Sequence, residues 1–165
     1  MAIFTGEKPG RVLMDQNNRQ PQSATESLGL PTQVNEVMTR SVMTLRRNDS
    51  FGAAVSLMAT KNVRHSIVVD DEDRILGVIS DRDVLRALAR TPDWQSKSVS
   101  EIMTPKPVVA RPDTLLIEAV GELLLKRINC LPVVLENGAV CGILTTTDLL
   151  KSYQQVLEST LHQER

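Results

Sequence analysis

Aromatic residues are scarce in this chain of 165 residues: they make up 2% of it. A packed core must therefore be built mainly from Val, Leu, Ile, Ala and Met. An excess of charge of either sign is also missing, since the net charge is −1. This balance argues against a nucleic-acid partner, because proteins that bind nucleic acid usually present a strongly basic surface.

Long apolar runs are missing as well. None approaches the roughly 18 residues that a transmembrane helix needs, and the opening "MAIFTGEKPGRV" lacks the apolar stretch of a signal peptide. A cytoplasmic protein with no membrane partner is expected.

The only cysteines, Cys130 and Cys141, are surrounded in the sequence by apolar residues, which favours buried reduced thiols over a disulfide. The two histidines belong to no Cys/His cluster, so no metal site is expected.

What the chain does contain is a long internal repeat. "VNEVMT" (34–39) matches "VSEIMT" (99–104), and "GVISDRDVL" (77–85) matches "GILTTTDLL" (142–150). "AVSLMATKNVRHSIVV", which begins at Ala54, matches "AVGELLLKRINCLPVV" at the same offset of 65 positions. A constant offset over this length indicates an internal duplication.

Each copy predicts the order strand, helix, strand, strand, helix. Helical periodicity follows the natural N-caps Asp49-Ser50 and Asp113-Thr114, and a short apolar stretch at 42–45 or 108–109 predicts a preceding strand. The two apolar runs around each polar turn predict hairpins, at 67–69 with 75–79 and at 131–135 with 140–144. Pro92 ends the last helix of the first copy, whereas the last helix of the second copy is predicted from Thr147 to about Ser159.

The predicted organisation is a mobile polar tail (1–33), a first domain (34–91), a linker (92–98) and a second domain (99–165) with an extended C-terminal helix. One copy of about 55–60 residues forms only a marginal core by itself. The expected fold class is therefore α+β, with two βαββα repeats that pack sheet against sheet.

The strand-to-helix corner of each copy allows two interpretations. Ser80 with Asp83, and Thr145 with Asp148, fit a capping box, which by itself accounts for these residue types. A helix N-terminus after a strand is also suited to an anion, with a hydroxyl for phosphate and a carboxylate for ribose hydroxyls. Arg82 would add a fork-shaped phosphate donor. The capping box explains neither the Gly before each corner nor the duplicated strand, and both interpretations remain open at this point.

Together these motifs resemble a pair of CBS domains, the family named after cystathionine β-synthase. The resemblance rests on two copies of "V-x-E-h-M-T", on "h-P-V-V" or its variant and on "G-h-h-[ST]-x-x-D", where h is apolar, and it covers about residues 34–157. It implies a pseudo-two-fold sandwich with two clefts that bind adenosine compounds such as AMP, ADP, ATP or S-adenosylmethionine. No cofactor is required.

The resemblance also implies roles for individual residues. Ser80 and Thr145 would contact phosphate, and Asp83 and Asp148 would contact ribose. The adenine would lie against Val42, His65 and Val78 in one cleft, and against Val108, Cys130 and Ile143 in the other. The chain departs from the family at Ile67, where a Pro is usual, and at Arg82, whose counterpart is Thr147. The two clefts are therefore expected to differ.

These features favour a regulatory module that senses an adenine nucleotide and acts on an unidentified partner protein. The alternative is a structural or interaction module whose clefts do not bind. An enzyme is not expected, because no nucleophile–base pair or paired carboxylates stand out beyond the cap acids. A homodimer is expected from the resemblance and from apolar positions in excess of what a small sheet needs, at Leu115, Leu116, Leu123 and Leu124. The C-terminal helix is either an assembly element or packed on its own domain.

Overall fold

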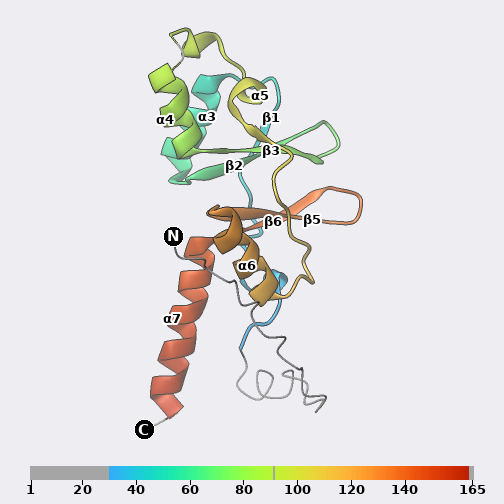
Figure 1. Cartoon of the computed structure of the whole chain (residues 1–165), viewed down its shortest axis with the longest axis vertical. Helices are drawn as coiled ribbons and strands as arrows, with labels where there is room; N and C mark the ends of the chain where they lie inside the picture. Colours follow the sequence, from blue (N-terminus) through green and yellow to red (C-terminus); the bar gives the residue numbers. More distant parts are fainter. Residues whose placement is uncertain (1–29, 91, 164–165) are drawn as a thin grey trace, which may run out of the picture.

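The computed structural model describes residues 30–90 and 92–163, so most of the predicted tail lies outside the described residues. Two β-hairpins face each other at the centre of the molecule, and helices cover the outer side of each (Figure 1). This arrangement confirms the predicted α+β sandwich of two repeats. Within the described part, no helix is both long and apolar enough to span a membrane.

The first repeat follows the predicted order. It contains β1 (Thr44–Arg46), α3 (Phe51–Lys61), β2 (His65–Val69), β3 (Ile75–Ser80) and α4 (Asp81–Arg90). β1 runs parallel to β2, and β2 and β3 form the predicted antiparallel hairpin. Ser50 is the N-cap of α3, as predicted, and its Oγ accepts from Ala53 N at 3.1 Å. α4 ends two residues before Pro92, which cannot continue a helix.

The second repeat repeats the hairpin but not every detail. A 3₁₀ turn (Trp94–Ser96) leads to α5 (Val99–Ile102), β4 (Thr104–Pro105), α6 (Leu116–Lys126), β5 (Cys130–Val134), β6 (Val140–Thr145) and α7 (Thr146–Gln163). The strand expected at 108–109 is reduced to one parallel bridge, Ala110 with Val133. Prolines at 105, 107 and 112 interrupt this segment and lack the N–H group that a strand ladder requires.

The predicted cap of α6 was also wrong. Leu115 occupies the N-cap position and makes no side-chain cap hydrogen bond. The Oγ1 of Thr114 accepts instead from Arg111 N at 2.8 Å, which closes the preceding turn. The hydroxyl therefore stabilises the turn rather than the helix end.

The two halves of the molecule exchange the opening segment of each repeat. α2 (Val34–Val37) packs on the second half, where Val34 is buried beside Ala119 and Leu131. Val99 of α5 is buried in the first half beside Phe51. The last residues of the predicted tail, directly before α2, also contact the second half: the Thr32 carbonyl accepts from Leu116 N at 2.7 Å. Neither half is thus complete without the other repeat.

This exchange explains why the Gly and the "MT" motif recur together. A Cβ on Gly77 would lie 2.5 Å from Met103 Sδ and 2.8 Å from the carbonyl oxygen of Thr104. A Cβ on Gly142 would lie 2.6 Å from Met38 Sδ. Each glycine therefore makes room for the methionine of the exchanged segment, a requirement that helix capping alone does not create.

A separate apolar layer lies between the two sheets. Its buried residues come from both hairpins, and Val42 packs against them. They are Ile67, Val69, Val78, Cys130 and Ile143. This layer holds the two hairpins face to face and leaves the strand-to-helix corners at its edge, where the candidate site lies.

Candidate functional site

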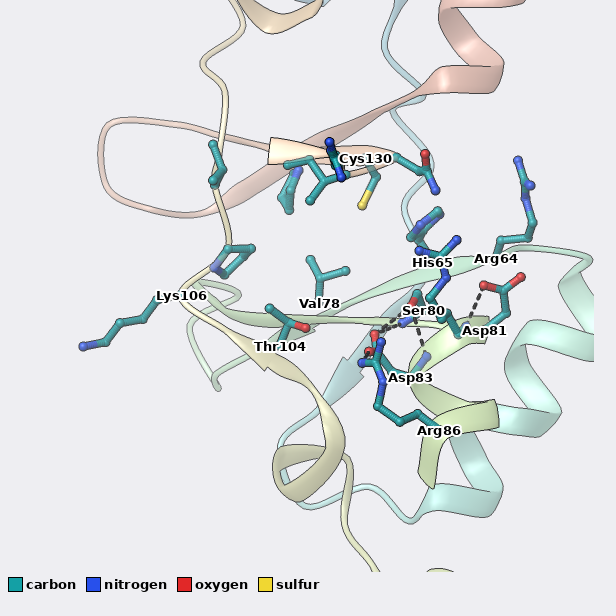
Figure 2. A pocket seen from close by; sticks show the side chains of 17 residues that line it. Arg64, His65, Val78, Ser80, Asp81, Asp83, Arg86, Thr104, Lys106 and Cys130 are labelled. Carbon is teal, nitrogen blue, oxygen red and sulfur yellow. Dashed lines mark hydrogen bonds and ion pairs between the residues drawn. The ribbon is translucent and has the colours of Figure 1, made fainter. Parts of the chain in front are cut away.

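A cavity of about 440 Å³ opens between the two halves of the molecule. One wall is the end of β3 and the start of α4, and the other is the segment after β4 together with the turn between α6 and β5 (Figure 2). Its volume falls within the range of small-molecule sites. The pocket is therefore shared by the two repeats.

Seven of the residues singled out from the sequence line this one pocket: His65, Val78, Ser80, Arg82, Asp83, Val108 and Cys130. The predicted division between two clefts differs, because it places Val108 and Cys130 with Ile143 and apart from His65 and Val78, whereas here these four residues line one pocket. Pairing of β4 with β3 carries the following segment across to the first half. This crossover brings Val108 to the Asp83 corner.

The other predicted residues lie elsewhere. Val42 and Ile143 belong to the apolar layer between the sheets. Thr145 ends β6, while Thr147 and Asp148 lie in the first turn of α7. The structure thus brings Thr145 and Asp148 together at a second corner, without placing them at the pocket described above.

The Asp83 corner forms the complete capping box. One carboxylate oxygen of Asp83, Oδ2, accepts from Ser80 N at 2.9 Å and from Ser80 Oγ at 2.6 Å, and Ser80 Oγ accepts from Asp83 N at 3.2 Å. The second oxygen, Oδ1, pairs with the exposed guanidinium of Arg86 at 2.9 Å. Oδ1 is thus the oxygen that a ligand hydroxyl can reach by displacing a surface ion pair, whose own contribution is small.

The Asp148 corner forms the same capping box, but the second oxygen of the carboxylate has a different partner. Asp148 Oδ2 accepts from Thr145 N at 2.8 Å and from Thr145 Oγ1 at 2.6 Å. Its Oδ1 accepts from Thr39 Oγ1 at 2.8 Å, and Arg64 donates to Thr147 Oγ1 at 3.2 Å. Asp148 is 9% exposed. Side chains of the first repeat therefore already form hydrogen bonds with the polar groups of this corner.

Burial and charge set the ionisation of two groups in the pocket. Partial burial lowers the pKa of His65, the charge of Asp81 raises it to a smaller extent and that of Arg64 lowers it further, so the imidazole is neutral at pH 7. Burial, and secondarily the charge of Asp83, raise the pKa of Cys130 to about 12. The Cys130 thiol therefore remains protonated and acts as an apolar wall, and both cysteines are free, as predicted.

The half-buried, neutral His65 predicts that the stability of the fold decreases in mild acid. The unfolded chain binds a proton at the ordinary histidine pKa of about 6.5, whereas the folded chain resists protonation. The free energy of unfolding should therefore decrease as the pH falls below about 6.5 and stop decreasing, for this group, below the folded pKa. Urea titrations between pH 7.5 and 5 measure this slope. His65→Gln should reduce it, and an unchanged slope would contradict the assignment.

Several pocket residues were not found from the sequence. They include Arg86, Thr104, Lys106, Arg127 and Asn129. The repeat offers a signal for Thr104, which follows the recurring methionine, and helical spacing offers one for Arg86, three residues after Asp83. No local pattern marks Lys106 or Arg127, because only the crossover of the second repeat brings them to this pocket.

No group of three or more His, Cys, Asp or Glu side chains that could hold a metal ion occurs among the residues that the structure describes. The polar side chains of the pocket instead combine carboxylate, guanidinium and hydroxyl groups around an apolar floor (Figure 2). Such a set is suited to a ligand with a flat apolar part, hydroxyls and negative charge.

Comparison with known proteins agrees with this architecture. The chain is 31% identical over 116 residues to a homoserine O-acetyltransferase of Methanococcus vannielii, which is 70% of this chain but 24% of that protein. It is similar to the crystal structure of CBSX2 in complex with AMP, with a TM-score of 0.68, 30% identity and coverage of 76% of this chain and 98% of the other. The CBS domain pair of protein MJ0100, in complex with 5′-methylthioadenosine and S-adenosyl-L-methionine, aligns with a TM-score of 0.70, 25% identity and coverage of 76% and 98%.

The chain spans about a quarter of the curated homoserine O-acetyltransferase that it matches, so the similarity concerns the paired repeats and not the whole of that protein. The profile of the CBS domain matches residues 34–90 and again residues 99–155. These ranges include both copies of every motif that recurs in the sequence. The chain therefore belongs to the CBS domain family, with two CBS domains in tandem.

Proposed function

We propose that this protein is a regulatory module that binds an adenine nucleotide of the AMP, ADP or ATP type and acts on a partner protein through a change in conformation or assembly. The observation that carries the proposal is the pocket of about 440 Å³ in which Asp83 faces an apolar floor and a set of cationic side chains. Val78, Val108 and Cys130 supply apolar surface for an adenine. Asp83 Oδ1 supplies an acceptor for ribose.

The structures of related CBS pairs support this ligand class, since one contains AMP and another 5′-methylthioadenosine and S-adenosyl-L-methionine. S-adenosylmethionine therefore stays a further candidate, and no cofactor is proposed. The alternative is an interaction module whose clefts do not bind. One observation favours it for the second corner: Thr39 and Arg64 already satisfy the polar groups around Asp148 and Thr147.

Thermal unfolding of the full chain with AMP, ADP, ATP, S-adenosylmethionine and 5′-methylthioadenosine tests the proposal. A ligand at 100 times its Kd stabilises the folded state by about 2.7 kcal/mol, which raises the Tm by about 5–10 °C for a chain of this length. GTP serves as a control for nucleotide charge without adenine. If no adenosine compound shifts the Tm, the interaction-module alternative is favoured.

The surface of the second repeat supports a homodimer. On α7, Leu150 is 68% exposed, Tyr153 61% and Leu161 66%, and these positions follow helical spacing. Ile117 and Leu124 of α6 are also exposed. Two of the four leucines proposed for this purpose from the sequence do not contribute a free face, because Leu123 is buried and Leu116 packs against the core. The unpartnered face lies mainly on α7 instead.

We predict that this face joins two copies of the chain. Light scattering at micromolar concentration should give about twice the chain mass of 18.3 kDa. Removal of residues 152–165 should weaken the dimer by at least about tenfold in Kd, since several large apolar side chains lose their burial. The truncated chain should remain folded by circular dichroism, because the buried residues of the second-half core come from other segments. Unfolding on truncation would mean that the helix is core, and a monomeric full chain would remove the proposal.

A further inference from the structure

The walls of the pocket carry an excess of positive charge. Five cationic side chains line it, namely Arg64, Arg82, Arg86, Lys106 and Arg127, against two carboxylates, Asp81 and Asp83. The cations come from both repeats: Arg64 lies directly before β2, Arg82 and Arg86 lie in α4, and Lys106 and Arg127 belong to the second repeat. Charges of one sign around a single cavity raise the local concentration of a ligand of opposite charge.

Most of this charge is not neutralised by the protein. Arg86 forms an ion pair with Asp83. Asp81 Oδ1 instead accepts from the backbone N–H of Arg82 at 2.7 Å. Within the described residues, no salt bridge joins Arg82, Lys106 or Arg127 to a carboxylate. These three side chains are exposed and available to an anion that enters the pocket.

The fold itself does not require these charges. The residues 65 positions away in the other repeat are neutral: Thr147 corresponds to Arg82, Asn62 to Arg127 and Ser41 to Lys106. Arg127 is the clearest case. It ends α6 in the left-handed conformation, with a φ of 55°, as Asn62 ends α3 with a φ of 51°. Asn tolerates that conformation better than most residues, so the first repeat uses the structurally favoured residue and the second places a guanidinium at the pocket.

Ser80 is not free to replace these cations as the phosphate donor. Its hydroxyl hydrogen is directed to Asp83 Oδ2 at 2.6 Å, and Ser80 Oγ itself accepts from Asp83 N at 3.2 Å. A hydroxyl has one hydrogen, so a bond from Ser80 to phosphate would require the loss of the bond to Asp83. Guanidinium groups, with five donors each, meet no such conflict.

We propose that this pocket selects a nucleotide with two or more phosphates, whose phosphate chain is held jointly by Arg82 and Arg86 of the first repeat and by Arg127 of the second, with a smaller contribution from Lys106 on the same wall as Arg127. The inference rests on the proposed function of the same pocket. A polyphosphate chain would join the two halves through charge, whereas a single phosphate would engage fewer of these side chains.

Calorimetry of the full chain with AMP, ADP, ATP and inorganic tripolyphosphate tests the proposal. Affinity should increase from AMP to ATP by at least about tenfold, with a loss at high salt that is largest for ATP. Three substitutions introduce the residue that the other repeat carries: Arg82→Thr, Arg127→Asn and Lys106→Ser. Arg82→Thr and Arg127→Asn should each weaken ATP by about tenfold and AMP by less than about threefold. Lys106→Ser should act in the same direction with a smaller effect.

Lys126→Asn is the matched control, because Lys126 neighbours Arg127 on α6 but does not line the pocket. It should leave all four affinities unchanged. Equal affinity for AMP and ATP in the wild type, or equal weakening of both in Arg82→Thr and Arg127→Asn, would overturn the proposal. Binding of tripolyphosphate without binding of any adenosine compound would refute the proposed adenine specificity but support the joint binding of the phosphate chain by the arginines of both repeats. Absence of binding by all four ligands would overturn both.

Discussion

Replacement of Asp83 by Ala is expected to weaken adenine-nucleotide binding by about 10- to 150-fold. Loss of a charge-assisted hydrogen bond costs about 1.5–3 kcal/mol, and Asp83 Oδ1 is the pocket acceptor for ribose hydroxyls in the proposed complex. Calorimetry with AMP and ATP measures the effect. Both ligands should weaken to a similar extent, because the ribose is common to them.

The capping role of Asp83 has to be separated from its ligand role. Its Oδ2 accepts from Ser80 N and Ser80 Oγ, so Asp83→Ala should also lower the free energy of unfolding by about 1 kcal/mol. Asp83→Asn keeps a side-chain oxygen for the cap and removes the charge. It should restore part of the stability but little of the affinity. If affinity stays unchanged in both variants while stability falls, Asp83 is only a helix cap.

Asp148→Ala provides the comparison within the same chain. We expect it to reduce stability more than Asp83→Ala, by about 1–3 kcal/mol, because Asp148 is buried and the hydroxyls of both Thr39 and Thr145 lose their acceptor at this partly buried corner. If the Asp148 corner also holds a ribose, as the family resemblance implies, a second binding event disappears in this variant. If the wild type binds one ligand per chain and Asp148→Ala leaves that affinity unchanged, this corner joins the two repeats without binding.

Gly77→Ala is expected to destabilise the fold by about 1–3 kcal/mol, the usual cost of overpacking. The new methyl group would lie 2.8 Å from the Thr104 carbonyl oxygen and 2.5 Å from Met103 Sδ. A methionine side chain can move, but the backbone oxygen belongs to β4, whose register places Pro105 opposite Gly77. Relief of the contact would therefore separate β4 from β3. Urea unfolding monitored by circular dichroism measures the loss.

Two other glycines serve as controls for this prediction. For Gly142→Ala the three nearest atoms all belong to the flexible Met38 side chain, so this substitution should cost less than about 1 kcal/mol. Gly121 lies within α6 with open space around its Cα, and Gly121→Ala should stabilise the helix by about 0.5–1 kcal/mol. Equal losses at Gly77 and Gly142 would show that the backbone contact with β4 is not the decisive one.

Most of the local structure could be predicted from the sequence because it depends on neighbouring residues. Short apolar runs around polar turns predict both hairpins, and Ser50 and Pro92 mark where α3 begins and where α4 can no longer continue. The constant offset between the copies indicates the duplication, and the recurring motifs carry the resemblance to the CBS domain family, to which the chain belongs. The capping boxes at Asp83 and Asp148 are also local, since each closes within four residues.

The sequence alone determined the two repeats, their helices and hairpins, and the residues of each strand-to-helix corner, because short-range periodicity and capping encode them. Only the tertiary structure decided which corner faces which segment. The exchange of α2 and α5 between the halves, and the pairing of β4 with β3, bring Val108, Cys130 and Arg127 to Asp83 and Thr39 to Asp148. These contacts join residues far apart in the chain, and their burial and charge arise only when the two halves pack together.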